Sequence, residues 1–400
     1  MPEIIEKQGY KYTEEFGYIP EDWEIITLGQ VGNVSMCKRI MKDETTETGE
    51  VPFYKIGTFG GEPDAYISKE KFEIYKNKYS YPSKNDILIS AAGTIGRTVV
   101  FDGKPAYFQD SNIVWLQHNN NKVLNKYLYY VYKTDPWYTT TGGTIARLYN
   151  ENITKATILK PSIPEQEKIA EVLGDVDGLI DKTQQLINKK KDLKTATMQK
   201  LLTPKEGWIT KTLEELNIEM LKGNGLSKEQ LSDAGKYYCI HYGELFTFYK
   251  ECIKNIKHKT NIATVFSKIN DVLMPSSDVT PTGLAKASCI KSDNVVLGGD
   301  ILILRCKKVI DGTFLSYLIR RDKNQILQLV SGTTVYHIYP NDMKKFKISY
   351  PKNISEQEKI ATILSDMDSE IEALEKELNK YKDLKTGMMQ QLLTGKVRLI

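Results

Sequence analysis

Histidine and cysteine, two residue types that can supply a nucleophile, a base or a metal ligand, are few and scattered in this chain. No histidine stands at the spacing of a catalytic triad or a zinc site, and no two cysteines form a C-x-x-C pair. We therefore expect free thiols, no metal site, no catalytic residues and no disulfide framework. These residues are His118, His241, His258 and His337, and Cys37, Cys239, Cys252, Cys289 and Cys306.

Motifs for phosphate, base or cofactor chemistry are incomplete. The segment GNGLSK at 223–228 lacks the glycine spacing of a loop that cradles ATP phosphates. The acidic pair formed by Asp64 and Glu70 lacks the E-x-K spacing of a nuclease. A DNA methyltransferase would need a glycine-rich cofactor loop and an Asn/Asp-Pro-Pro-aromatic corner, and neither occurs. The sequence therefore predicts a chain that is not itself an enzyme and holds no cofactor.

Length and charge suit a globular protein with several domains. The chain has 400 residues, of which 40% are hydrophobic, so two or three domains are expected. Its 55 basic and 51 acidic residues give a formal charge of +4, so any affinity for nucleic acid must come from the distribution of charge. We find no apolar stretch long enough to span a bilayer and no signal peptide, which predicts a cytoplasmic protein without membrane contact.

A duplicated segment dominates the sequence. Residues 165–203 and 356–394 align at an offset of 191, with roughly 22 of the 39 positions identical. Apolar residues recur in steps of three and four in both copies, and neither copy contains proline, which predicts two long helices. Each helix has a narrow apolar stripe, so we expect the two to pair as an antiparallel coiled coil. Pairing between chains, or packing of each helix on its own domain, is the alternative.

The duplication extends more faintly into the segments before each helix. Asn85 and Asp86 align with Asn270 and Asp271, and short β-type runs bounded by Gly, Pro, Asn and Asp follow in both. We expect α/β or α+β domains in two copies, related by a pseudo-two-fold repeat. The predicted boundaries are 1–160 for the first domain, 161–203 for the first helix, 204–350 for the second domain, and 351–400 for the second helix and tail.

Several motifs, in this order, resemble the specificity subunits of Type I restriction-modification systems. The resemblance covers essentially the whole chain, and the motifs are weak singly but specific in combination. They are GYIPEDW at 17–23, SAAGTIGRTVVF at 90–101, GGTIARL at 142–148, IPEQEKI at 163–169 and LLTGKVRL at 392–399.

The resemblance implies a DNA-recognition subunit that performs no covalent chemistry. Each target-recognition domain would read one half of a bipartite, asymmetric site in double-stranded DNA, and the helices would set the spacer and dock two methyltransferase subunits. S-adenosylmethionine, ATP and Mg would then be cofactors of those methyltransferase subunits and of a separate restriction subunit.

Candidate DNA contacts are cations, aromatic residues and glycine loops in the two domains. Lysine and arginine would contact phosphates, and polar side chains would contact base edges. In the first domain they are Lys38, Arg39, Tyr54, Lys55, Arg97, Gly142, Gly143, Thr144 and Arg147. In the second they are Lys222, His241, Tyr242, Lys257, Lys259, Ser276, Ser277, Lys286, Gly332, Thr333, Thr334, Tyr336 and His337.

Residues that are identical in the two helices are candidates for binding one type of partner twice. They are Glu165, Gln166, Lys168, Asp192 and Lys194 in the first copy, and Glu356, Gln357, Lys359, Asp383 and Lys385 in the second. Two other functions stay open from the sequence. The chain could be a coiled-coil-tethered interaction protein that never binds DNA, or a detached recognition module of a fused restriction-methylation enzyme.

Overall fold

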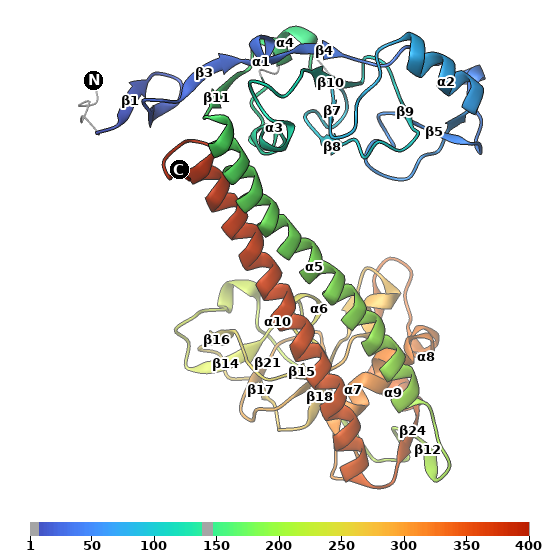
Figure 1. Cartoon of the computed structure of the whole chain (residues 1–400). Coiled ribbons are helices and arrows are strands. Elements are labelled where there is room, and N and C mark those ends of the chain that lie inside the picture. The colour runs from blue at the N-terminus through green and yellow to red at the C-terminus, as the bar shows by residue number, and fades with distance from the viewer. Residues whose placement is uncertain (1–7, 138–146, 400) are drawn as a thin grey trace. The chain divides into compact units, whose positions relative to one another are not determined.

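The computed structural model describes residues 8–137 and 147–399, which form two compact units. Unit 1 consists of Met1–Thr183 and Leu378–Ile400, and unit 2 consists of Gln184–Glu377. Both units contain strands, short helices and parts of two long helices, α5 (Ile163–Leu202) and α10 (Ile354–Leu392) (Figure 1). The predicted fold class, α/β domains in two copies with two long helices, is confirmed.

Unit 1 is built on a four-stranded sheet with the order β4-β10-β7-β8. The same unit contains a three-stranded sheet, β6-β5-β9, in which β5 and β9 run parallel. The strands are β1 (Tyr10–Thr13), β2 (Gly17–Pro20), β3 (Glu24–Thr27), β4 (Asn33–Ser35), β5 (Val51–Tyr54), β6 (Tyr66–Ile67), β7 (Ile87–Ser90), β8 (Thr98–Val100), β9 (Tyr107–Phe108), β10 (Ile113–Gln117) and β11 (Thr157–Lys160). The shorter helices are α1 (Leu28–Val31), η1 (Lys42–Glu44), α2 (Lys69–Lys78), α3 (Asn125–Tyr132) and α4 (Asn150–Lys155).

Unit 2 repeats this topology with additions. Its five-stranded sheet has the order β13-β22-β18-β20-β15, and a second sheet, β16-β14-β21-β17, again contains a parallel pair, β14 and β21. The strands are β12 (Trp208–Thr212), β13 (Glu219–Lys222), β14 (Tyr237–Ile240), β15 (Cys252–Ile253), β16 (His258–Thr260), β17 (Val265–Phe266), β18 (Asp271–Pro275), β19 (Ser277–Asp278), β20 (Ser288–Ile290), β21 (Val296–Leu297), β22 (Ile301–Arg305), β23 (Tyr336–His337) and β24 (Lys347–Pro351). The shorter helices are η2 (Lys228–Gln230), α6 (Glu244–Thr247), η3 (Pro281–Ala285), α7 (Gly312–Arg321), α8 (Lys323–Leu329) and α9 (Pro340–Met343).

The turn that precedes the central strand is the same in both units. Asn85 and Asn270 have φ angles of 73° and 76°, in the left-handed region that asparagine tolerates better than most residues. The next residue is an aspartate, Asp86 or Asp271, whose carboxylate accepts a backbone N–H from three residues earlier at 2.8 Å. The repeated Asn-Asp pair in the sequence is therefore a repeated turn that leads into a buried strand.

Within each unit, α5 and α10 run side by side and antiparallel. In unit 2, Lys191 pairs with Glu375 at 2.7 Å and Lys194 pairs with Asp368 at 2.6 Å, so the residue number falls on α10 as it rises on α5. In unit 1, the earlier part of α5 meets the later part of α10 through the pair of Asp177 and Lys385. Apolar residues of both helices join the main core of their unit.

A buried glutamine fastens the start of each long helix to a short helix of the same unit. The amide of Gln166 accepts the backbone N–H of Leu124 at 2.9 Å and donates to the carbonyl of Pro161 at 2.9 Å. Gln357 makes the corresponding bonds with Asp311 and Pro351, both at 2.9 Å. Leu124 and Asp311 are the N-cap residues just before α3 and α7, so each glutamine fixes the start of the short helix that packs beside its sheet.

Among the described residues, no helix is both long and apolar enough to cross a bilayer, and no group of three potential ligand side chains lies close enough to hold a metal ion. The five cysteines are free thiols. Cys252 and Cys289 lie opposite each other on the parallel strands β15 and β20, which the sequence could not predict because the two residues are far apart in the chain.

Candidate nucleic-acid interface

The loop after strand β7 brings Arg97 to the end of the unit 1 sheet. The hydroxyl of Ser90 accepts the backbone N–H of Arg97 at 2.9 Å and donates to the carbonyl of Thr94 at 2.5 Å. Gly93 and Gly96 have φ angles of +66° and +77°, which glycine adopts without strain. The motif SAAGTIGR therefore forms a tight loop whose arginine side chain is exposed.

Segment 109–112, which leads into strand β10, collects candidate residues from other parts of unit 1. The N–H of Gln109 donates to the carbonyl of Tyr54 at 2.9 Å, which places the end of β5 against this segment. The guanidinium of Arg39 donates to the carboxylate of Asp110 at 2.8 Å. Residues separated by more than fifty positions in the sequence thus meet at one end of the sheet.

The other cations of this region are also held by groups of unit 1. Arg147 donates to the carbonyl of Ser111 at 2.7 Å, Arg97 to that of Phe59 at 2.5 Å, and Lys55 pairs with Asp64 at 2.8 Å. We call the resulting set candidate face 1: Arg39, Tyr54, Lys55, Arg97 and Arg147. Lys38 is not gathered with them, because its ammonium lies 5.5 Å from the ring centroid of Tyr79. The predicted loop residues Gly142, Gly143 and Thr144 lie outside the described residues.

Candidate face 2 lies at the corresponding end of the unit 2 sheet. Lys222, at the end of β13, pairs with Asp300 at 3.6 Å, and the N–H of Ser276, just after β18, donates to the carbonyl of Asp300 at 2.8 Å. His241 and Tyr242 follow β14 directly. The carbonyl of Ile240, the last residue of β14, accepts the N–H of Gly298, which joins this strand end to the segment before β22.

A small antiparallel pair, β19 with β23, extends candidate face 2. Ser277 lies opposite His337, and Tyr336 lies opposite Asp278. A bridge between Ser331 and His337 closes the loop that carries the predicted glycine and threonines. We define candidate face 2 as Lys222, His241, Tyr242, Ser276, Ser277, Gly332, Thr333, Thr334, Tyr336 and His337.

Three predicted lysines of unit 2 lie beside this face and contact aromatic rings. The ammonium of Lys286 donates to the carbonyl of Phe246 at 2.7 Å. The ammonium groups of Lys257 and Lys259, on either side of His258 at edge strand β16, lie 4.2 Å and 4.9 Å from aromatic ring centroids. The structure therefore does not gather these lysines with the residues that meet at Asp300.

Burial changes the chemistry available to some of these side chains. His241 is only 7% exposed, and burial lowers the pKa of its imidazole below its usual value. Its Nδ1 lies 3.1 Å from the backbone N of Gly243, so the neutral ring accepts there and carries its proton on Nε2. Burial, and then the charge of Arg320, lowers the pKa of Lys286. Ser276 is also buried, so its neighbour Ser277 is better placed for contact.

Two aspartates at these faces, Asp110 and Asp300, were not predicted from the sequence. Each lies just before the strand that pairs with the central strand of its sheet, β10 in unit 1 and β22 in unit 2, and each pairs with a predicted cation. The only sequence signal is their place ahead of the runs NIVWLQ and ILILR, which is too common to identify a site. Each ion pair leaves other N–H donors of the cation available to an oxygen acceptor such as a phosphate or a base edge.

The predicted partner-binding residues divide into buried and exposed groups. Glu165, Gln166 and Gln357 are buried and bonded within their own units, so the expectation that they lie on a contact surface is wrong for these three. Lys194 and Lys385 are half-buried and ion-paired. Glu356 is partly exposed, and the remaining four are exposed: Lys168, Asp192, Lys359 and Asp383.

On each long helix, the structure shows an exposed leucine next to one of these exposed residues. Leu193 and Leu384 are 51% and 50% exposed, and each follows the exposed aspartate of its copy. Thr195 and Thr386 are exposed and identical as well. The same large apolar side chain is therefore exposed at equivalent positions of both copies, where burial within a unit does not account for it.

Comparison with known proteins identifies relatives over the whole chain. The family model described as "Type I restriction modification DNA specificity domain" matches residues 20–190 and 205–381. The Type I restriction enzyme MjaVIII specificity subunit of Methanocaldococcus jannaschii is 26% identical, and the alignment covers 99% of each chain. A candidate type I restriction enzyme specificity subunit of Haemophilus influenzae is 56% identical over 176 residues, which is 44% of this chain and less than half, 46%, of that protein.

A solved structure shares the fold. The crystal structure of the S subunit of a Type-I restriction-modification system from M. genitalium superimposes with a TM-score of 0.63 at 16% sequence identity. The match covers 96% of this chain and 98% of that one. At this identity the likeness shows a common fold, in agreement with the repeated sheet topology of the two units.

Proposed function

The chain belongs to the family of Type I restriction modification DNA specificity domains, and from this premise we propose that it is the DNA sequence-recognition subunit of a Type I restriction-modification complex. The observation that carries the proposal is the repetition of one topology with two different faces. Candidate face 1 and candidate face 2 lie at the same end of equivalent sheets, yet their residues differ. Two related but unequal faces suit a bipartite, asymmetric site.

Both faces offer a cation suited to phosphates, and face 2 also offers side chains suited to base edges. Exposed Arg97 in face 1 and exposed Lys222 in face 2 are suited to phosphates, because their positive charge releases counterions from the DNA backbone. Tyr336 and His337 in face 2 could bond to base edges in the major groove. The neutral ring of His241 would contribute only through its Nε2–H or its shape. We propose that unit 1 reads one half-site and unit 2 reads the other.

The exposed residues shared by the two helices support two equivalent partner contacts. We propose that Asp192, Leu193 and Thr195 of α5 bind one methyltransferase subunit and that the equivalent residues of α10 bind a second. The helices would also set the spacer between the half-sites. The chain would perform no covalent chemistry. Adenine-N6 methylation with S-adenosylmethionine, and DNA cleavage driven by ATP with Mg in a restriction subunit, would belong to the partners.

The test is to coexpress this chain with the DNA methyltransferase encoded in its own genome and to map methylated adenines by sequencing. The expected result is one split motif with two different half-sites and a fixed spacer, absent from cells that express the methyltransferase alone. Unchanged methylation with and without this chain, together with no salt-dependent binding of the complex to DNA, would overturn the proposal.

A further inference from the structure

Each unit contains a three-residue cluster in which the same residue types occupy equivalent positions. In unit 1, the Tyr130 hydroxyl donates to Asp177 Oδ2 at 3.0 Å, and Lys385 Nζ donates to Asp177 Oδ1 at 2.6 Å. We call this cluster junction 1. Burial raises the pKa of the tyrosine hydroxyl, with the charge of Asp177 adding to the effect, so the hydroxyl stays protonated and acts as the donor.

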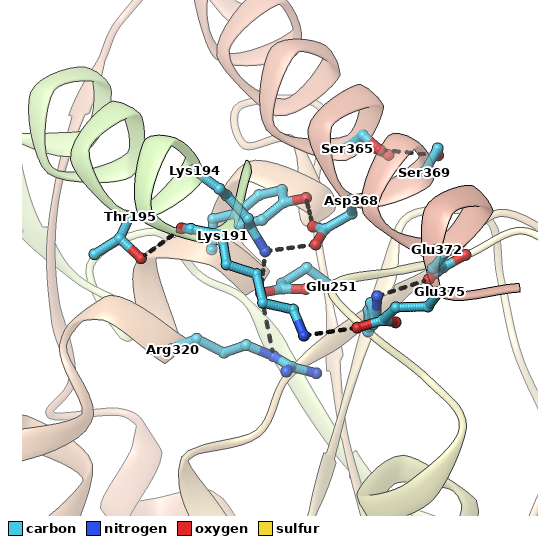
Figure 2. A network of polar contacts seen from close by, with 12 residues as sticks. Lys191, Lys194, Thr195, Glu251, Arg320, Ser365, Asp368, Ser369, Glu372 and Glu375 are labelled. Carbon is cyan, nitrogen blue, oxygen red and sulfur yellow. Dashed lines mark hydrogen bonds and ion pairs between the residues drawn. The ribbon is translucent and has the colours of Figure 1, made fainter. Parts of the chain in front are cut away.

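Junction 2 repeats this geometry in unit 2. The Tyr317 hydroxyl donates to Asp368 Oδ2 at 2.7 Å. Lys194 Nζ donates to Asp368 Oδ1 at 2.6 Å (Figure 2). The lysine nitrogen lies 5.4 Å from the tyrosine ring centroid, the same separation as in junction 1. Because these contacts are the same in two units whose other surfaces have diverged, we infer that junctions 1 and 2 have the same role in their units.

Each junction ties three elements together. The tyrosine comes from α3 or α7, the short helix that begins at the buried glutamine bond and packs beside the sheet. The aspartate comes from one long helix and the lysine from the other. A slip of one long helix along the other would separate the lysine from the aspartate, and a tilt of the short helix would separate the tyrosine from it. The junction therefore fixes both arrangements within its unit.

The two junctions differ in the charges around the lysine. Lys194 also contacts Glu251 at 3.4 Å, a buried carboxylate of unit 2 that lies 4.0 Å from Arg320 (Figure 2). A further ion pair within unit 2, between Lys250 and Glu372 at 3.3 Å, joins the segment after α6 to α10.

In the described part of unit 1, Lys385 forms an ion pair with Asp177 alone. Lys133, which occupies the position of Arg320 on its short helix, has a pKa below its usual value because of partial burial and then the nearby charge of Lys385. In the described part of unit 1, Asp177 is the carboxylate that acts on both Lys385 and Lys133, whereas Lys194 contacts both Asp368 and Glu251. Junction 1 is therefore the weaker of the two, because like charges repel and each buried charge needs a compensating charge.

We propose that junctions 1 and 2 are positioning sites that hold each recognition domain on the helix pair, so that the complex tolerates little variation in the spacer between half-sites. Junction 2 holds its domain more firmly than junction 1. The inference rests on the proposed function, because a spacer exists only if the chain reads a bipartite site. None of these side chains needs to touch DNA, and each acts through the elements it connects.

The test measures spacer preference in a methylation assay with the coexpressed methyltransferase. The substrates keep both half-sites of the wild-type motif and vary the spacer by one base pair in either direction. The variants are Asp177→Asn and Asp368→Asn. The matched controls are Asp175→Asn and Asp366→Asn, which change exposed carboxylates two residues earlier on the same helices. We expect the ratio of native to altered spacer to fall about tenfold in Asp368→Asn, the size of effect typical for loss of a hydrogen-bonded charge, and less in Asp177→Asn.

Several outcomes separate the possibilities. If the wild-type chain directs methylation to no motif, the proposed function fails. If it does, and both junction variants lose activity but keep the native spacer ratio, the junctions are merely structural and the inference is overturned. Should the asparagine variants fail to fold, Tyr317→Phe and Tyr130→Phe remove one hydroxyl each, and their spacer ratios decide. Lys194→Arg and Lys385→Arg should retain the wild-type ratio, because arginine can also pair with the aspartate.

Discussion

Gln166 and Gln357 show how an identity between two copies arises from bonds within the chain. Each side chain uses its carbonyl oxygen and its amide group in equivalent hydrogen bonds: to the N-cap of a short helix, to the loop before that helix, and to the segment where the preceding strand ends and the long helix begins. From the sequence alone these identities predict a partner surface, but the side chains are fully buried. Identity between copies alone does not distinguish internal packing from external binding.

Replacing either glutamine by leucine should destabilise its own unit. Gln166→Leu would leave the N–H of Leu124 and two carbonyl groups without partners, at a cost of about 3 kcal/mol. Gln357→Leu should have an effect of similar size in unit 2. Chemical denaturation, monitored by amide hydrogen exchange at individual residues, can assign each loss of the free energy of unfolding to a unit.

The control for these variants is Gln185→Leu, because Gln185 is exposed on α5. It should change the free energy of unfolding by less than about 0.5 kcal/mol. If the two buried variants were as stable as this control, the hydrogen bonds described here would contribute nothing and the account of the repeated glutamine would be wrong.

At this scale, local turns could be predicted and long-range contacts could not. The pair Asn85 and Asp86 has a recognisable turn chemistry, and its repetition marks the strand that follows. The contact between Arg39 and Asp110 joins residues far apart in the chain, and nothing in the sequence around either residue indicates it. The DNA role of every candidate residue stays a prediction, because side-chain identity does not fix a docking geometry.

At the scale of elements, the two long helices were predicted from periodicity, and their antiparallel pairing is confirmed within each unit by the ion pairs between them. The sheets were predicted only as short β-type runs. Their order could not be derived, because register depends on contacts between distant segments. The parallel pairs β5–β9 and β14–β21 in particular leave no mark in the sequence.

The exposed leucines of the helices give a prediction at this scale. Leu193→Asp and Leu384→Asp should each weaken the association with one methyltransferase subunit by about tenfold, because a charge replaces an apolar contact. The double variant should lose both subunits. Mass measurement of the purified complex and titration of the methyltransferase subunit would show the stoichiometry and the affinity.

Leu186→Asp is a matched control for the leucine variants. Leu186 is also exposed on α5, and the corresponding position of α10 is Glu377, so an acidic residue is compatible with the helix there. This variant should bind methyltransferase like the wild type. An equal loss of binding in the control would mean that helix charge, and not a defined surface, governs the association.

At the scale of the whole molecule, repetition with divergence predicts that the two recognition functions are separable. Replacing residues 1–160 by the equivalent domain of another family member should change one half-site of the methylated motif and keep the other. Deleting one heptad within 171–191 and one within 362–382 should change the spacer and keep both half-sites. Sequencing of methylated adenines reads all of these results directly. A heptad deletion that altered a half-site would contradict the role assigned to the helices.

Unit 2 is continuous in the chain, whereas unit 1 needs residues from both ends of the described sequence. Once residue 377 has emerged from the ribosome, all residues of unit 2 are available for folding. Unit 1, although its first strand is made earliest, must wait for Lys385 and Arg398, which pair with Asp177 and Glu165. The half of the protein that is synthesised first is therefore completed last, and a nascent chain would expose the apolar face of α5 in unit 1 until α10 arrives to cover it.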